Sequence, residues 1–156
     1  MSVAFRRDSD EEHLEPKFEL PIPPGPNLVT ARGFALIEVR LADIEAQLAG
    51  ELAEDERKAV LRDARYWRHQ FTSAQIAPTP SGETVAIGTT VTIARGNSER
   101  CTIEIVGHDE ADPAANRIVF SAPLARALIG AEVGEEVEFP APGEMIRVAA
   151  IAVGAD

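Results

Sequence analysis

The chain has little cysteine, little basic charge and no long apolar run. Cys101 is the only cysteine among 156 residues, so no disulfide can form within one chain, and a reducing cytoplasm is expected. Arginine and lysine number 15 against 26 aspartates and glutamates, which gives a formal net charge of -11. Direct DNA binding needs cationic side chains that replace phosphate counterions, so this balance argues against it. No stretch approaches the roughly 18 apolar residues of a membrane helix, and residues 1–12 lack the apolar run of a secretory signal.

The patterns of a self-contained active site are also missing. His13, His69 and His108 fall in three separate segments. The sequence contains no phosphate-binding glycine loop, no zinc-ligand spacing and no nucleophile elbow. Cys101 alternates with isoleucines and is expected to be a core residue. We therefore predict no catalytic residue, no cofactor and no metal site belonging to this chain alone.

Residues 1–29 form an acidic, proline-rich N-terminal segment. Proline removes a backbone donor and fixes φ, so this segment is expected to be an extended arm without a continuous helix or a central strand. Phe18, Leu20 and Ile22 alternate with polar residues or proline, so a short part of the arm could dock on another surface. The simpler interpretation is a solvated tail.

Residues 30–77 have the apolar periodicity of two helices. Apolar side chains recur at alternating spacings of three and four, which places them on one helical face. In the first helix they are Phe34, Ile37, Leu41, Ile44 and Leu48. In the second helix they are Val60, Ala64, Trp67, Phe71 and Ala74. Because neither helix can bury its stripe alone, an antiparallel helical hairpin, a short coiled coil, is predicted. Thr30 is its expected N-cap, Gly50 is expected to end the first helix in a left-handed conformation, and Pro78 follows the second.

Residues 83–156 change to the alternation of β-strands. Strands are predicted around residues 91–93, 103–105, 118–120, 137–139 and 145–153, with glycine or proline between them. Residues 123–129 (PLARALI) predict one short helix that begins at Pro123 and is followed by Gly130. The second domain is therefore expected to be a small, mostly antiparallel sheet with one helix, which makes the fold class α+β.

Several ordered motifs resemble the Gre family, the bacterial GreA and GreB transcript cleavage factors. The hairpin opens with VTARG at residues 29–33 and closes with AQI at residues 74–76, similar to V-T-x-x-G and A-x-V or A-x-I. The second domain carries IVG at 105–107, DEAD at 109–112, APLARALIG at 122–130, VGEEV at 133–137 and PG at 142–143. These resemble V-G-x-x-E-A-D, S-P-x-A-R-A-L-I-G, V-G-D-x-V and P-x-G, in family order, over about residues 28–153.

The resemblance implies a fold, a partner and a mode of action. The second domain would have an FKBP-like fold without isomerase activity. The protein would dock at the rim of the secondary channel of bacterial RNA polymerase, with its hairpin in the channel. It would act as a monomer, meet nascent RNA only indirectly, bind no DNA sequence and no membrane, and not itself be an enzyme.

The hairpin tip carries the residues that the resemblance links to transcript cleavage. The family tip G-D-L-S-E-N-A-E-Y brings two carboxylates to the Mg²⁺ of the polymerase, and Mg²⁺ prefers such hard oxygen ligands. Here the tip is GELAEDERK at residues 50–58, so Glu51 and Glu54 match the two carboxylates and Asp55 replaces an asparagine. Ala53 replaces the capping serine, and Lys58 replaces the tyrosine. Acidic residues in the first turn of a helix also favour its dipole, which is the structural interpretation of this cluster.

The arms of this hairpin are shorter than those of the cleavage factors by roughly one to two heptads, or about 10–20 Å at 1.5 Å per residue. A carboxylate short by that distance cannot ligate a metal at about 2.1 Å. The sequence thus predicts a polymerase-binding regulator without efficient transcript cleavage, as in the regulator of nucleoside diphosphate kinase, a member of the same superfamily with a shortened hairpin. The alternatives are an active cleavage factor using Glu51 and Glu54, or a protein-interaction adaptor on the same scaffold.

Three further clusters are candidate sites. The basic residues of the second helix, Arg62, Arg65 and Arg68, match an RNA-facing patch of the family, although ion pairing with the acidic first helix or Asp63 is the structural alternative. The resemblance assigns polymerase-rim contact to Ser121, Ala122, Pro123, Leu124 and Arg126, where the family usually has a more polar D-S-P or N-S-P. Asp109, Glu110 and Asp112 are interpreted as a loop between strands and not as a metal cluster.

Overall fold

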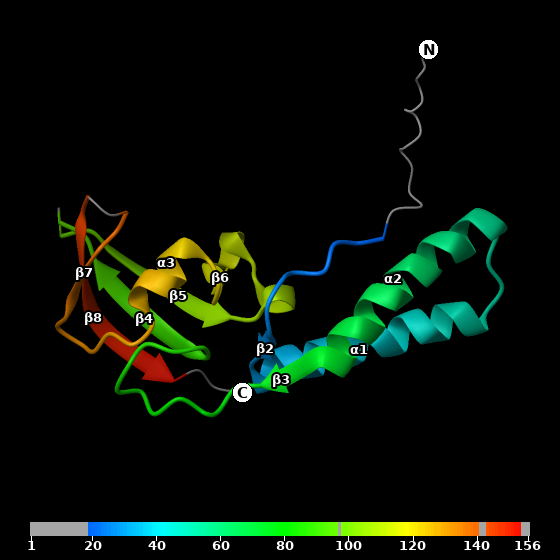
Figure 1. The fold of residues 1–156 in the computed structure, drawn as a ribbon, viewed down its shortest axis with the longest axis horizontal. Helices are drawn as coiled ribbons and strands as arrows, with labels where there is room; N and C mark the ends of the chain where they lie inside the picture. Colours follow the sequence, from blue (N-terminus) through cyan, green and yellow to red (C-terminus); the bar gives the residue numbers. More distant parts are fainter. Residues whose placement is uncertain (1–18, 97, 141–142, 154–156) are drawn as a thin grey trace, which may run out of the picture. The chain divides into compact units, whose positions relative to one another are not determined.

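The computed structural model describes residues 19–96, 98–140 and 143–153 (Figure 1). The prediction of an extended arm for residues 1–18, including Phe18, lies outside the described residues. The described chain forms two compact units, one of residues 19–24 and 37–73 and the other of residues 25–36 and 74–153. Both helices and strands are present, which confirms the mixed α and β composition expected from the sequence.

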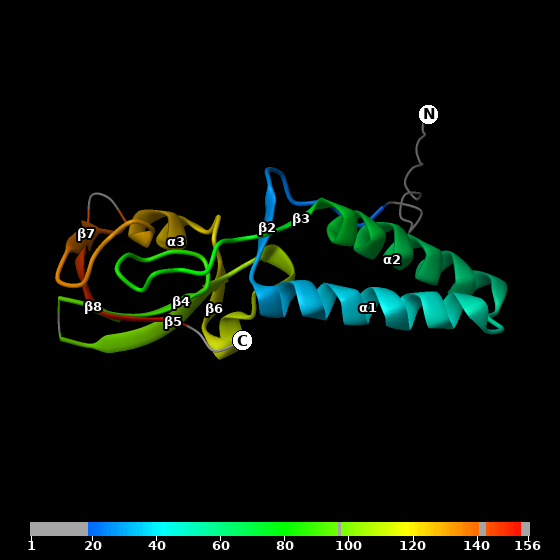
Figure 2. The same ribbon diagram turned by 90° about the horizontal axis from the view of Figure 1, so that it is seen from below.

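Two long helices form the predicted hairpin (Figures 1 and 2). Helix α1 spans Ala31–Ala49, helix α2 spans Glu54–Ser73, and the turn of residues 50–53 joins them. Ile37, Ile44 and Ala64 of the apolar stripes are buried, as the spacing requires. Phe71 is 39% exposed, so the stripe of α2 is less covered toward its carboxyl end. The buried positions confirm which face of each helix is apolar.

The ends of α1 differ from each other in how well the sequence predicts them. Thr30 is the expected N-cap, because its Oγ1 accepts a hydrogen bond of 2.9 Å from the backbone N–H of Gly33. The prediction of a left-handed Gly50 is wrong, since Gly50 is not among the glycines with positive φ. Its N–H donates instead to the carbonyl of Gln47 at 3.2 Å. The guanidinium of Arg57 donates to the carbonyls of Leu48 and Gly50 at 3.4 and 3.2 Å, so a side chain of α2 satisfies two acceptors at the end of α1.

A pair of three-residue strands replaces two expected features. Strand β2 (Asn27–Val29) lies within the expected arm, and strand β3 (Ala74–Ile76) lies where the second helix was expected to continue to residue 77. The two strands are parallel, with Val29 opposite Ile76, and Ala77 N–H donates to the Val29 carbonyl at 2.8 Å. The helix ends at Ser73 because the next backbone groups pair with β2 and not with the preceding helical turn.

A five-stranded sheet forms the core of the second unit (Figure 1). Its strands are β4 (Thr89–Ala94), β5 (Arg100–Val106), β6 (Arg117–Val119), β7 (Glu136–Glu138) and β8 (Met145–Val153). The order is β6-β5-β4-β8-β7, and only the β5–β6 pair is parallel. Helix α3 (Pro123–Leu128) follows β6, and short 3-10 turns η1 (His108–Glu110) and η2 (Pro113–Ala115) lie between β5 and β6. The predicted strands, the short helix and the mostly antiparallel pairing are confirmed.

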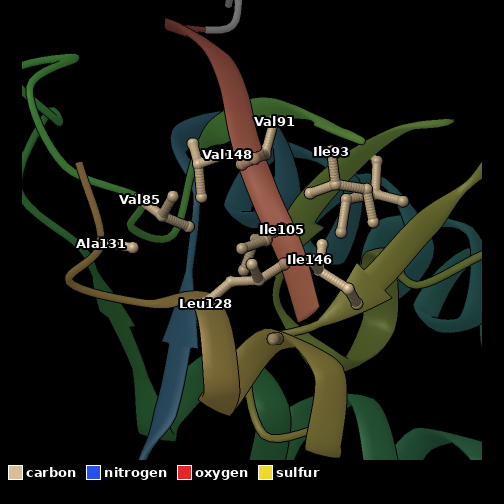
Figure 3. Packing of buried hydrophobic residues seen from close by; sticks show 10 residues of the cluster. Val85, Val91, Ile93, Ile105, Leu128, Ala131, Ile146 and Val148 are labelled. Carbon is tan, nitrogen blue, oxygen red and sulfur yellow. The ribbon is translucent and has the colours of Figure 1, made fainter. Parts of the chain in front are cut away.

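One face of this sheet packs against α3 (Figure 3). Val91, Ile93, Ile105, Ile146 and Leu128 are fully buried there. Burying each such side chain contributes roughly 1.5–3 kcal/mol to stability. Cys101 is partly buried against this cluster, as its position on an alternating strand predicted. Within the described part of the chain, no helix is long and apolar enough to cross a membrane.

Candidate functional site

A buried carboxylate holds the start of α1 within the second unit. Glu110 of η1 is 8% exposed. Its Oε1 accepts a hydrogen bond of 2.7 Å from the hydroxyl of Thr30, and its Oε2 accepts one from Nε of Arg32. The other end of the Arg32 guanidinium donates to Glu104 of β5, whose second oxygen lies 3.2 Å from Nε of Arg117. The N-terminal turn of α1 is thereby bonded to η1 and the sheet.

The electrostatics of this network favour the charged form of Arg32. Burial alone would lower the pKa of Arg32, but the hydrogen bonds to Glu110 and then to Glu104 outweigh it and raise the pKa. Both carboxylates are engaged by cationic or hydroxyl donors, so neither is free to act as a base or a metal ligand. The network is a positioning device and not a catalytic centre.

Two glycines permit the close contacts of this junction. A Cβ on Gly33 would lie 2.8 Å from Oε1 of Glu110, and a Cβ on Gly107 would lie 2.5 Å from the carbonyl oxygen of Leu28. These are the glycines of the VTARG and IVG motifs. Gly107 therefore allows a close approach of the Leu28 backbone that a side chain would block, and Gly33 leaves room for the Glu110 carboxylate. The role of Glu110 itself was missed, because its partners lie 80 and 78 residues away.

The three tip candidates lie in or next to the turn between the long helices. Glu51 lies in the turn, and Glu54 and Asp55 begin α2; all three side chains are exposed. Nζ of Lys58 lies 4.0 Å from Glu54 in an i,i+4 arrangement. Exposure leaves these carboxylates accessible to a partner. The position of Glu54 and Asp55 in the first turn of α2 also suits the helix dipole.

Half of a capping box survives at the tip. Ala53 has no side chain that could cap α2, yet its N–H donates to Oε1 of Glu56 at 3.2 Å. Arg57 N–H donates to the Ala53 carbonyl at 2.8 Å, which places Ala53 at the N-cap. The third residue of the helix thus reaches back to the cap backbone even though the capping hydroxyl is gone.

The basic residues of α2 are paired with acidic side chains of the same unit. Arg65 binds both carboxylate oxygens of Glu19, at 2.6 and 2.8 Å, and Arg68 binds both oxygens of Glu45, at 2.8 and 2.9 Å. Side-chain hydrogen bonds from these arginines are the main cause that lowers the pKa of Glu19 and of Glu45. Arg62 lies 3.8 Å from Asp63. Ion pairing thus accounts for Arg68 and for Arg65, which is held by the arm and not by the first helix, whereas Nε of Arg62 is buried without a hydrogen-bond partner.

The candidate rim residues surround the turn between β6 and α3. Ser121, Pro123 and Arg126 are exposed. Ala122 and Leu124 instead pack against the core cluster. The sequence pattern did not separate these two groups, because it carries no information on which side of a six-residue helix faces the sheet.

The acidic segment after β5 lies between β5 and β6, where the sequence predicted a loop between strands. Glu110 is engaged by Thr30 and Arg32, and Oδ1 of Asp112 accepts the N–H of Ala114 at 3.2 Å at the start of η2. Over residues 19–96, 98–140 and 143–153, no group of three or more histidine, cysteine, aspartate or glutamate side chains is placed to hold a metal ion. The segment therefore caps and braces neighbouring turns.

Comparison with known proteins identifies the family. The family profile described as Transcription elongation factor, GreA/GreB, C-term matches residues 79–154. The transcription elongation factor GreA of Maricaulis maris is 34% identical over 110 residues, which are 64% of this chain and 70% of that relative. The chain belongs to the GreA/GreB family. The resemblance stated from the sequence motifs is thereby confirmed.

Other relatives of this GreA/GreB-family chain match it over shorter stretches. GreA of Mesorhizobium japonicum is 48% identical over 64 residues, 40% of this chain and 41% of the relative. GreA of Legionella pneumophila is 42% identical over 79 residues, 50% of this chain and 49% of the relative. The chain spans about half or less of the length of these relatives. Among solved structures, GreA factor homolog 1 (Gfh1) of Thermus thermophilus aligns at 20% identity and a TM-score of 0.40, over 81% of this chain and 99% of that chain.

The GreA/GreB profile covers the sheet and α3 but begins after the hairpin. The turn of residues 121–123 lies inside it, whereas Glu51 and Glu54 lie outside it. Roles for the tip residues in this GreA/GreB-family chain therefore depend on the sequence pattern of residues 50–58 and on the geometry of the hairpin.

Proposed function

We propose that this chain binds bacterial RNA polymerase at the rim of the secondary channel and regulates elongation without efficient transcript cleavage. Membership of the GreA/GreB family supports the class of partner. The protein acts on the polymerase and is not itself an enzyme. An FKBP-like second domain, action as a monomer in the cytoplasm, and only indirect contact with RNA belong to the same proposal.

The length of the hairpin is the observation that carries the proposal. Helices α1 and α2 contain 19 and 20 residues, which correspond to about 30 Å at 1.5 Å per residue. The sequence resemblance implies arms longer by about 10–20 Å in the cleavage factors. Glu51 and Glu54 sit at the far end of these short helices, and a carboxylate must lie about 2.1 Å from Mg²⁺ to bind it. A hairpin of this length occupies the channel without placing its carboxylates on the metal.

The exposed part of the β6–α3 turn is the proposed contact with the polymerase rim. Ser121, Pro123 and Arg126 are available on the surface, and Leu124 positions them by packing on the core. The paired state of Arg65 and Arg68 supports only indirect contact of the hairpin with RNA, because an incoming phosphate must first displace a carboxylate.

An active cleavage factor is the second candidate. The exposure of Glu51, Glu54 and Asp55 favours it, since a partner meets no steric obstacle at these side chains. A protein-interaction adaptor on the same scaffold is the third, and it is favoured by the bond between Glu19 of the arm and Arg65. The three candidates differ in whether the polymerase is bound and whether its transcript is shortened.

Stalled bacterial elongation complexes, with a GreA-type factor as control and competitor, distinguish these candidates. We expect the chain to bind, to leave the transcript intact and to reduce cleavage by the GreA-type factor. The double variant Glu51→Gln, Glu54→Gln should compete equally well, because the two carboxylates that it lacks do not reach the metal in the original chain. Transcript shortening that disappears in this variant establishes the cleavage factor instead. Absence of binding and of competition leaves the adaptor.

A further inference from the structure

A row of three residues crosses the sheet at the end where β4 finishes and β8 begins. Ala94 lies opposite Arg100 on β5 and opposite Arg147 on β8. Directly opposite residues of antiparallel strands project from the same face, so both arginines flank the small side chain of Ala94. Strands lie about 4.8 Å apart, which separates the two arginine Cα atoms by about 10 Å. The neighbouring residues Ile93 and Val148 point to the other face, into the core.

This row lines a hollow of about 310 Å³. Arg95 and Gly96 form its rim, and both are held by Glu144, which accepts from the Arg95 guanidinium at 3.1 Å and from the Gly96 N–H at 3.2 Å. Among the described residues, Glu136 of β7 is the one acidic residue in the lining, and it lies opposite Arg147 of β8. The hydrogen bonds of Glu144 thus hold Arg95 and Gly96 in place, and neither Arg100 nor Arg147 takes part in them.

The two arginines stand out in an acidic chain. Other arginines of α1, α2 and β6 form ion pairs with glutamate or aspartate. Within the part of the chain that the structure describes, Arg100 and Arg147 form no hydrogen bond or ion pair with a carboxylate. Two guanidinium groups across one small residue offer paired N–H donors to a compact anion, and phosphate oxygens match that geometry.

We propose that the hollow around Ala94 binds the phosphate groups of a small molecule through Arg100 and Arg147. A diphosphate group offers more acceptor oxygens to the guanidiniums on both sides of Ala94 than a single carboxylate does. A long nucleic acid is disfavoured, because its phosphates outside the hollow would meet the surface of a chain with a net charge of -11, which has few cations to replace their counterions. This site is separate from the hairpin tip and does not depend on binding to the polymerase.

Titration of the full chain with pyrophosphate at low ionic strength, followed by NMR, tests the proposal. We expect saturable shifts of the amides of Ala94, Gly96 and Arg147. Arg100→Gln and Arg147→Gln should each weaken binding about tenfold, the loss expected for one charge-assisted contact. Glu136→Gln should tighten binding about threefold, because it removes a repelling charge. Arg40→Gln, which changes an exposed arginine of α1 outside the row, should leave the affinity for pyrophosphate unchanged.

A nucleoside diphosphate and a single-stranded oligonucleotide are two additional probes that identify the source of the phosphate. Equal affinity for pyrophosphate and a nucleoside diphosphate supports recognition of the phosphates alone, and tighter binding of the nucleotide supports a nucleotide ligand. Shifts that do not saturate, equal weakening by Arg40→Gln, or tighter binding of a single-stranded oligonucleotide than of pyrophosphate would each overturn the proposal. Circular dichroism of each variant separates a lost contact from a lost fold.

Discussion

The hydroxyl of Thr30 joins the first turn of α1 to Glu110, a residue 80 positions further along the chain, through a hydrogen bond of 2.7 Å. The same oxygen atom of Thr30 accepts the N–H of Gly33, so one side chain both caps the helix and bonds the buried carboxylate. Because a buried donor or acceptor without a partner costs free energy, the Thr30 hydroxyl and the Glu110 carboxylate stabilise each other. The start of the hairpin is therefore specified by the second unit and not by helix propensity alone.

Replacing Glu110 by alanine should lower the free energy of unfolding by about 2 kcal/mol, since hydrogen bonds to a charged group contribute roughly 1.5–3 kcal/mol. Glu110→Gln should cost less, because the amide oxygen can still accept from Thr30. Urea denaturation measures both values. Glu83→Ala removes an exposed carboxylate and should change the stability by less than about 0.5 kcal/mol. Equal losses for Glu110→Ala and Glu83→Ala contradict the network.

Gly107→Ala should destabilise the protein by about 1–3 kcal/mol, the usual range for atoms forced into a packed site. The added Cβ would lie 2.5 Å from the Leu28 carbonyl oxygen, so strand β2 must shift away. Gly96→Ala is the matched control, because its Cβ would meet no heavy atom within 4 Å. Thermal unfolding of the two variants gives the comparison. A Gly107→Ala protein as stable as Gly96→Ala would mean that β2 does not pack against this glycine.

Acidification should destabilise the protein partly through His108. Burial lowers the pKa of His108, and the nearby charge of Asp109 opposes this effect. The unfolded chain therefore takes up the proton more readily, so this contribution to stability is complete above about pH 6.5 and declines as the pH falls below it. His108→Gln should show a smaller loss between pH 7.5 and pH 5 in urea denaturation, and Asp109→Asn a larger one. An unchanged profile in both variants excludes the effect.

The sequence predicted the elements whose signal is periodic and local. The spacing of Ile37 and Ile44 in α1, and the alternation through Ile103 and Ile105 in β5, specify which faces are buried. Strands β2 and β3 contain three residues each, too few to show alternation, and they pair across more than forty positions of chain. Pairing at that distance depends on backbone groups that every residue carries, so no side-chain pattern announces it.

The sequence showed which residue types the candidate site contains, but it did not show which of these residues bind one another. Arginines on α2 follow from the sequence, whereas the choice of Glu19 as the partner of Arg65 depends on the path of the arm. Gly50 suggested a left-handed cap, yet its φ is not positive, and the long side chain of Arg57 bonds the carbonyls of Leu48 and Gly50 from the next helix. Flexible side chains reach carbonyls and carboxylates far along the chain, and such contacts become evident only when the fold is known.

Arg57→Ala should loosen the hairpin tip, because the carbonyls of Leu48 and Gly50 lose their donor. The expected cost is about 1 kcal/mol, and hydrogen exchange of the Gly50 amide should quicken accordingly. If the tip must be ordered to occupy the polymerase channel, competition with a GreA-type factor should weaken in the same variant. Lys58→Ala is the control, since the Lys58 side chain is 73% exposed and its ion pair with Glu54 is long, at 4.0 Å. Faster exchange without weaker competition would show that channel occupancy depends on the helices and not on the order of the tip.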